Sequence, residues 1–254
     1  MASLQKAVVQ GLAEDRGLYM PERIVPLSSD FLAHLSDYSF QEIACQVADC
    51  FFGEDVPQEE LHALVCDTLS FDVPLVEVAP RIYSLELFHG PTLAFKDVGA
   101  RFMARLLGHF IRRSGSEELV NGLVATSGYT GSAVANGFLG VPGIHVYVLY
   151  PKGKVSPIQE CQFTTLGQNI TALEVDGVFD DCQALVKSAF MDAELSAHMR
   201  LTSANSINVA RFLPQSFYYF YACAQLQRRG WQGKTVACVP SGNFGNICSA
   251  LIGK

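Results

Sequence analysis

The chain has 254 residues, a formal net charge of −7 at pH 7, and 49% hydrophobic and 17% charged residues. This composition is ordinary for a globular protein with a buried core, and the length allows one large domain or two modest ones. The acidic balance, with no run rich in Lys and Arg, argues against nucleic acid as a partner. An anionic small substrate stays compatible, because a binding site needs only a few local cations.

The N-terminal residues and the cysteine pattern indicate a cytoplasmic protein. The first residues do not predict a signal peptide, because Glu14 and Asp15 come early and no apolar core precedes them. The best apolar run, residues 144–150, is far too short to span a membrane. Eight scattered cysteines without a Cys-x-x-Cys motif are typical of reduced, buried side chains. The six histidines are equally dispersed, so no metal site is expected.

Residues 1–78 are mainly helical in pattern and predict an N-terminal helical region. A first helix is expected over residues 4–12. Ser39 stands three residues before Glu42, the spacing of a capping box, and predicts a helix that runs to Phe52. A further helix is expected to begin near Pro57, since proline and acidic residues favour the first turn.

After residue 79 the pattern alternates between strands and helices. Helices are predicted over 97–113, 130–139, 156–167, 179–190, 207–229 with a kink at Pro214, and from 244 onward. Strands are predicted over 82–87, 119–125, 144–150, 170–175 and 235–239. Such alternation predicts an α/β fold, with a parallel sheet covered by helices on both faces.

The segment 88–97, Phe-His-Gly-Pro-Thr-Leu-Ala-Phe-Lys-Asp, places one lysine between an aromatic residue and an aspartate. A lysine amine whose pKa is lowered by the fold is a good nucleophile, and its commonest use is a Schiff base with an aldehyde cofactor. Most lysines are solvated surface charges, so Lys96 alone does not establish such a role.

A glycine-rich turn, Ser241-Gly-Asn-Phe-Gly-Asn246, follows a predicted strand and opens a predicted helix. Backbone N–H groups at a helix start favour a phosphate. The turn lacks the Gly-x-Gly-x-x-Gly pattern of dinucleotide binders, and a plain structural turn is the alternative. A lysine for an aldehyde together with a turn for a phosphate predicts pyridoxal phosphate as the cofactor.

Two further polar clusters also follow predicted strands, where open α/β sheets bind ligands. Residues 126–131 offer hydroxyls and N–H groups that suit a carboxylate, although an ordinary helix cap is the alternative. Asn205 and Ser206 come shortly before Arg211, which lies about one helical turn further on. Arginine binds phosphate in a forked geometry, whereas a solvated surface arginine is the alternative.

The chain resembles the threonine synthase family in five motifs that occur in the family's order. These are residues 88–97, 125–128, 149–154, 205–208 and 241–245. The N-terminal residues Gly11-Leu12, Gly17-Leu18-Tyr19 and Pro21-Glu22 also resemble that family. The resemblance covers essentially the whole chain, and several separated motifs in order are far more specific than any one of them.

The resemblance implies a fold-type II enzyme that uses pyridoxal phosphate and converts O-phosphohomoserine and water to threonine and phosphate. Lys96 would bind the cofactor and move protons during catalysis. The cofactor would be held by Tyr129, Gly242, Asn243, Phe244, Gly245 and Asn246. The substrate carboxylate would lie at Thr126, Ser127, Gly128 and Thr130, and the substrate phosphate at Asn205, Ser206 and Arg211. Residues 79–254 would form the cofactor-binding region, with a smaller α/β subdomain at about 120–205.

The chain departs from the family's pattern in two places. Tyr129 stands where the family usually has Asp or Asn, near the cofactor's ring oxygen. The chain also ends at Lys254, well before family members do, so the cofactor-binding region is expected to be C-terminally truncated. Two alternatives stay open: a related phospho-lyase that yields 2-oxobutanoate, and a non-catalytic binding module. The sequence also leaves homo-oligomerisation open.

Overall fold

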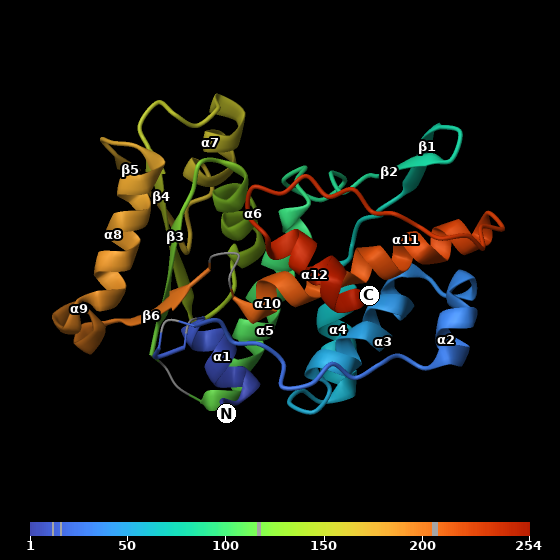
Figure 1. The fold of residues 1–254 in the computed structure, drawn as a ribbon. Helices are drawn as coiled ribbons and strands as arrows, with labels where there is room; N and C mark the ends of the chain where they lie inside the picture. Colours follow the sequence, from blue (N-terminus) through green and yellow to red (C-terminus); the bar gives the residue numbers. More distant parts are fainter. Residues whose placement is uncertain (12, 16, 116–117, 205–207) are drawn as a thin grey trace.

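The computed structural model describes residues 1–11, 13–15, 17–115, 118–204 and 208–254. A parallel sheet with its helices forms one side of the molecule, and a mainly helical part forms the other (Figure 1). The long helix α5 (Lys96–Ser114) lies between the two parts. No helix in the described ranges is long and apolar enough to cross a membrane.

The N-terminal region is helical, as predicted. Its elements are α1 (Leu4–Gln10), α2 (Ser29–Ala33), the 3-10 turn η1 (Leu35–Asp37), α3 (Phe40–Phe52) and α4 (Gln58–Thr68). The capping box is confirmed, since Ser39 Oγ accepts from Glu42 N–H and Glu42 Oε2 accepts from Ser39 N–H. Helix α1 is shorter than predicted, because Gly11 takes a φ of 74° and ends it; residue 12 lies outside the described residues.

A four-stranded parallel sheet runs in the order β5-β4-β3-β6. The strands are β3 (Val120–Ala125), β4 (Ile144–Pro151), β5 (Ile170–Val175) and β6 (Arg200–Ser203). Val120 pairs with both Ile144 and Arg200, so β3 is central. The predicted parallel sheet is confirmed, although the short strand β6 was not predicted.

Helices cover both faces of this sheet (Figure 1). They are α6 (Tyr129–Phe138), α7 (Pro157–Thr164), α8 (Phe179–Met191) and the short α9 (Ala193–His198). Ala125 and Leu149 pack with Cys182 and Val186 of α8, while Val124, one position away, belongs to the larger core on the other face. This alternation explains the continuous apolar runs of the strands, because a sheet buried on both faces needs apolar residues at successive positions.

Aromatic side chains join the helical part to α5. Phe102 of α5 lies 5.0 Å from Phe52 of α3 and 5.8 Å from Phe217, measured between ring centroids. All three rings are fully buried. Phe217 belongs to α11 (Ser216–Arg228), which follows α10 (Val209–Phe212) and the 3-10 turn η2 (Leu213–Gln215). The kink predicted at Pro214 lies at the right residue, but the predicted single helix is divided there, because Pro214 lies within η2 between two helices.

Two strand predictions differ from the structure. The strand expected at 82–87 is β2 (Ile82–Leu85), which pairs antiparallel with β1 (Leu75–Ala79) in a hairpin outside the parallel sheet. The strand expected at 235–239 is wrong: this segment has no regular structure, and Val236 is 90% exposed. An apolar sequence forms a strand only beside a partner strand, and within the described residues none pairs with it. The chain then ends with α12 (Gly245–Gly253).

Candidate functional site

Lys96 is the first residue of α5, and its side chain reaches the start of another helix. Its Nζ donates a hydrogen bond to Thr130 Oγ1 at 2.5 Å. Thr130 is the second residue of α6, directly after the turn that follows β3. The turn before Lys96 is tight, because Leu93 N–H donates to Gly90 O and Leu93 takes a φ of 56°. Two motifs that the sequence singled out therefore meet at one lysine.

The environment of Lys96 favours the neutral amine. Burial is the main cause, and the positive charge of Arg211 adds to it, so the pKa of Lys96 falls from 10.5 to about 8. A lysine with such a pKa has a far larger fraction of free amine near neutral pH than an ordinary lysine, and the free amine is the form that attacks a carbonyl carbon.

Arg211 lies beside this lysine and is buried, not solvated. Its side chain is 1% exposed, and burial lowers its pKa to about 10. One guanidinium nitrogen, Nη1, donates to Ala204 O, whereas Nε has no hydrogen-bond partner in the described part of the chain. A buried arginine with an unused donor is suited to an anionic ligand, because an unpaired buried donor is unfavourable until an acceptor arrives.

Asp97 supports the lysine turn, a role that the sequence analysis did not assign. Its carboxylate is 1% exposed and accepts from Thr92 N–H at 3.0 Å and from Thr92 Oγ1. Burial raises the pKa of Asp97, and the bonds from Thr92 oppose that rise. A Cβ on Gly90 would lie 2.5 Å from Asp97 Oδ2, so this close approach requires glycine. The sequence signal that could have indicated this role is the position of Asp97, directly after Lys96 at the start of a predicted helix.

The turn at 126–130 is organised by Thr126. Its buried Oγ1 accepts from the N–H groups of Gly128 at 2.9 Å and Gly131 at 2.8 Å. Gly128 takes a φ of 140°, which only glycine adopts readily. Ser127 and Tyr129 are exposed, the latter by 58%, while Thr130 is half-buried against Lys96. The turn thus presents one hydroxyl to the lysine and another to the surroundings.

The glycine loop before α12 is open. Gly242, Asn243 and Phe244 are exposed, and Gly245 begins the helix. Ser241 Oγ is buried and has no hydrogen-bond partner within the described ranges. A buried hydroxyl without a hydrogen-bond partner, shortly before the N-terminus of a helix, is consistent with an anion bound at this loop. Asn205 and Ser206, which were predicted to bind the substrate phosphate, lie outside the described residues.

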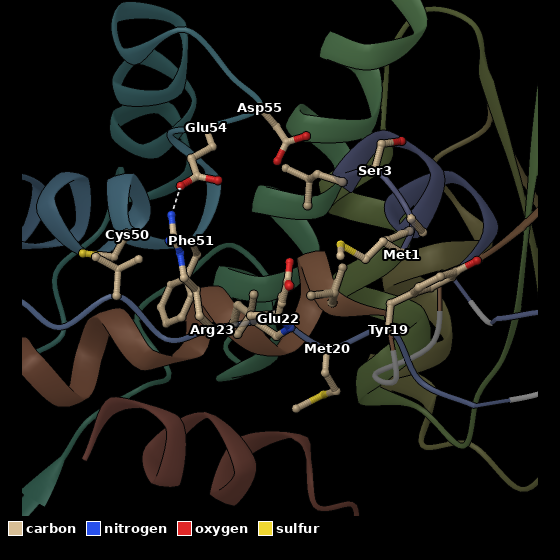
Figure 2. A pocket seen from close by; sticks show the side chains of 17 residues that line it. Met1, Ser3, Tyr19, Met20, Glu22, Arg23, Cys50, Phe51, Glu54 and Asp55 are labelled. Carbon is tan, nitrogen blue, oxygen red and sulfur yellow. Dashed lines mark hydrogen bonds and ion pairs between the residues drawn. The ribbon is translucent and has the colours of Figure 1, made fainter.

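A cavity of about 700 Å³ lies beside the N-terminal segment (Figure 2), and Lys96 is not among the residues that line it. The N-terminal segment and the end of α3 form much of its wall, and an ion pair joins Arg23 to Glu54 there. Val209 and Leu213, which flank Arg211 in sequence, also line it. Its lining residues include none of the predicted site residues, so charge and hydrogen bonding, not cavity volume, locate the candidate site at Lys96.

Comparisons with known proteins agree with the motifs. Residues 1–69 match the family model described as "Threonine synthase N terminus". The chain is 45% identical to threonine synthase of Escherichia coli and 47% identical to that of Haemophilus influenzae, with 99% of this chain covered in both. It spans 58% of the length of each of these curated relatives. A crystal structure described as pyridoxal-phosphate-bound threonine synthase from Brucella melitensis matches with a TM-score of 0.90 and 37% identity, over 99% of this chain and 55% of that one.

The fold and these matches give the chain the fold-type II architecture of pyridoxal-phosphate enzymes. Over the part of their length that it spans, the chain is similar in sequence and fold to threonine synthases.

Proposed function

We propose that this chain carries the cofactor lysine of a threonine synthase, which converts O-phosphohomoserine and water to threonine and phosphate. The observation that carries the proposal is Lys96, with its pKa lowered to about 8, its bond to Thr130 and its neighbour Arg211. An activated lysine beside an arginine with a free donor suits a reaction in which an amino acid loses a phosphate group.

The described residues fit pyridoxal phosphate as the cofactor. Lys96 offers a free amine for the aldehyde carbon, and Ser241 offers a buried, unpartnered hydroxyl beside the glycine loop for the phosphate. Gly242 to Asn246 would add backbone N–H groups at the start of α12, and Tyr129 would lie near the ring. When bound, this cofactor withdraws electrons from the substrate's α-carbon.

The chain's own residues would then perform three tasks. Lys96, once released from the cofactor, would take and return protons at the α- and β-carbons of the substrate. Thr126, Ser127, Gly128 and Thr130 would hold the substrate carboxylate at the start of α6. Arg211 would stabilise the departing phosphate together with Asn205 and Ser206. Burial of Arg211 strengthens that interaction, because little water competes for the guanidinium.

We also propose the organisation and setting expected from the sequence. Residues 1–78 form a helical region, and residues 79–254 form the cofactor-binding region, with a smaller α/β subdomain at about 120–205. A cytoplasmic location is consistent with eight cysteines that are all free thiols. The partner is a small molecule, O-phosphohomoserine.

The test is phosphate release from O-phosphohomoserine by the chain, and by a full-length protein that contains it, with pyridoxal phosphate present. Threonine as the organic product supports the proposal, while 2-oxobutanoate supports the phospho-lyase that Tyr129 keeps open. Lys96→Ala should abolish release in either case. Absence of release by the full-length protein contradicts the proposed reaction. Full release by its Lys96→Ala variant contradicts a catalytic role for Lys96.

A further inference from the structure

Two tyrosines of α11 meet the first turn of α12. Tyr218 OH donates to Asn246 Oδ1 at 2.9 Å, and Tyr219 OH donates to the same oxygen at 2.5 Å. Asn246 is the second residue of α12, immediately after the glycine loop. One side-chain oxygen therefore joins the start of this helix to two consecutive residues of another.

These two bonds fully occupy the Asn246 oxygen. An amide oxygen has two lone pairs, and each phenol has one hydrogen to donate. Burial raises the pKa of Tyr218 well above its ordinary value and that of Tyr219 to about 12, so both phenols keep their hydrogens at neutral pH. The side chain of Asn246 is thus fixed through its oxygen.

The tyrosine pair is itself firmly placed in the core. Tyr218 is fully buried, and its ring lies 4.9 Å from that of Tyr219. Tyr218 OH also donates to Gln215 Oε1 at the longer distance of 3.2 Å, so its one hydrogen is shared between two acceptors. Gln215 Nε2 in turn donates to Arg211 O at 2.9 Å. A continuous polar path therefore runs from the start of α12 to the backbone of the arginine beside Lys96.

Other described contacts at the end of the glycine loop are to the backbone: Phe244 O accepts from Cys248 N–H, and Asn246 O accepts from Ser249 Oγ. Gly242 to Phe244 are exposed, and a Cβ on Gly242 would meet no heavy atom within 4 Å. Backbone N–H groups bind a phosphate well only when they are held in place before it arrives. At the end of the loop, the described contacts that fix the Asn246 side chain are its hydrogen bonds from Tyr218 and Tyr219.

We propose that Tyr218 and Tyr219 are positioning residues for the cofactor phosphate. By holding Asn246 Oδ1 they fix the first turn of α12 and so aim the N–H groups of the glycine loop. This inference rests on the proposed function and deepens it. It also implies that position 246 needs an acceptor oxygen, not an amide NH₂ group.

The test compares two ligands that differ only in the phosphate. Affinities for pyridoxal phosphate and for pyridoxal are measured from the visible absorbance of lysine-bound ligand. In the double variant Tyr218→Phe, Tyr219→Phe, affinity for pyridoxal phosphate should fall about tenfold, the equivalent of one or two hydrogen bonds, while affinity for pyridoxal stays unchanged. Tyr221→Phe is the matched control, because its hydroxyl, on the same helix, lies 3.5 Å from Asp72 outside this network.

A substitution at position 246 removes the acceptor itself. Asn246→Ala should lower the preference for pyridoxal phosphate about tenfold. The single variant Tyr219→Phe, at a half-buried position, gives a smaller loss in the same direction and covers failure of the double variant to fold. An equal loss for both ligands, or no loss, overturns the inference. Absence of any lysine adduct in the unaltered chain instead overturns the proposed function, and this inference with it.

Discussion

Lys96 and Thr130 are 34 residues apart in sequence, yet Lys96 Nζ lies 2.5 Å from Thr130 Oγ1. Each residue stands in the first turn of its helix, α5 and α6 respectively. The contact brings the lysine turn and the turn after β3 to one place, with Arg211 close enough to affect the pKa of the lysine.

The first prediction concerns the pH at which Lys96 reacts. The free amine of Lys96 should appear as pH rises through about 8, well below the 10.5 of an ordinary lysine. Arg211→Met removes the neighbouring positive charge and should move the midpoint to higher pH, though only partly, because burial is the larger cause. Acylation of Lys96 against pH, followed by mass spectrometry, measures the midpoint. Arg211→Lys keeps the charge and should keep the midpoint; a midpoint near 10.5 in the unaltered chain would contradict the prediction.

The second prediction concerns the cost of burying Lys96. Its folded pKa lies below its unfolded value, so the unfolded chain binds more protons between pH 8 and 10.5, and stability rises with pH in that window. Lys96→Met should therefore raise the free energy of unfolding at pH 7 by up to about 3 kcal/mol, and by less as pH approaches 10.5. Denaturant unfolding at several pH values measures this. The exposed Lys152→Met is the control and should change little; a destabilised Lys96→Met would speak against a buried charge.

The third prediction concerns the contact between α5 and α10. A Cβ on Gly99 would overlap Arg211 O, a backbone atom that cannot move without α10. Gly99→Ala gains about 1 kcal/mol of helix propensity but should lose more through this clash, for a net destabilisation of about 1–3 kcal/mol. Gly122→Ala is the control, since its nearest contact would be an ordinary 3.5 Å. Equal unfolding midpoints for the two variants would show that α5 and α10 are not packed this closely.

The fourth prediction concerns the turn after β3. Thr126→Ala removes the acceptor for the N–H groups of Gly128 and Gly131, in a buried position, and should cost about 2–3 kcal/mol. Thr126→Ser keeps the oxygen and should recover most of that loss. Chemical denaturation of both variants decides, and a Thr126→Ala variant as stable as the serine variant would refute the role given to the hydroxyl.

Local chemistry allowed much of the fold to be predicted. The capping box predicted at Ser39 was correct because its hydrogen bonds lie within one helical turn. The predicted parallel sheet was correct because strands that are buried on both faces have continuous apolar sequences. The strand predicted over 235–239 was wrong because a strand needs a neighbouring strand, and the local sequence does not show whether one is present. Lys96 was singled out from its motif, but its bond to Thr130 is a long-range contact. The tyrosine pair on Asn246, about 28 residues away along the chain, was missed for the same reason.

The most direct test of the central claim is to mix the chain with pyridoxal phosphate, reduce with borohydride and map the labelled peptide by mass spectrometry. The account predicts one labelled site, Lys96. The label should form more readily above pH 8, where the free amine prevails, than below it. No label at Lys96, or label spread equally over exposed lysines such as Lys152 and Lys154, would contradict it.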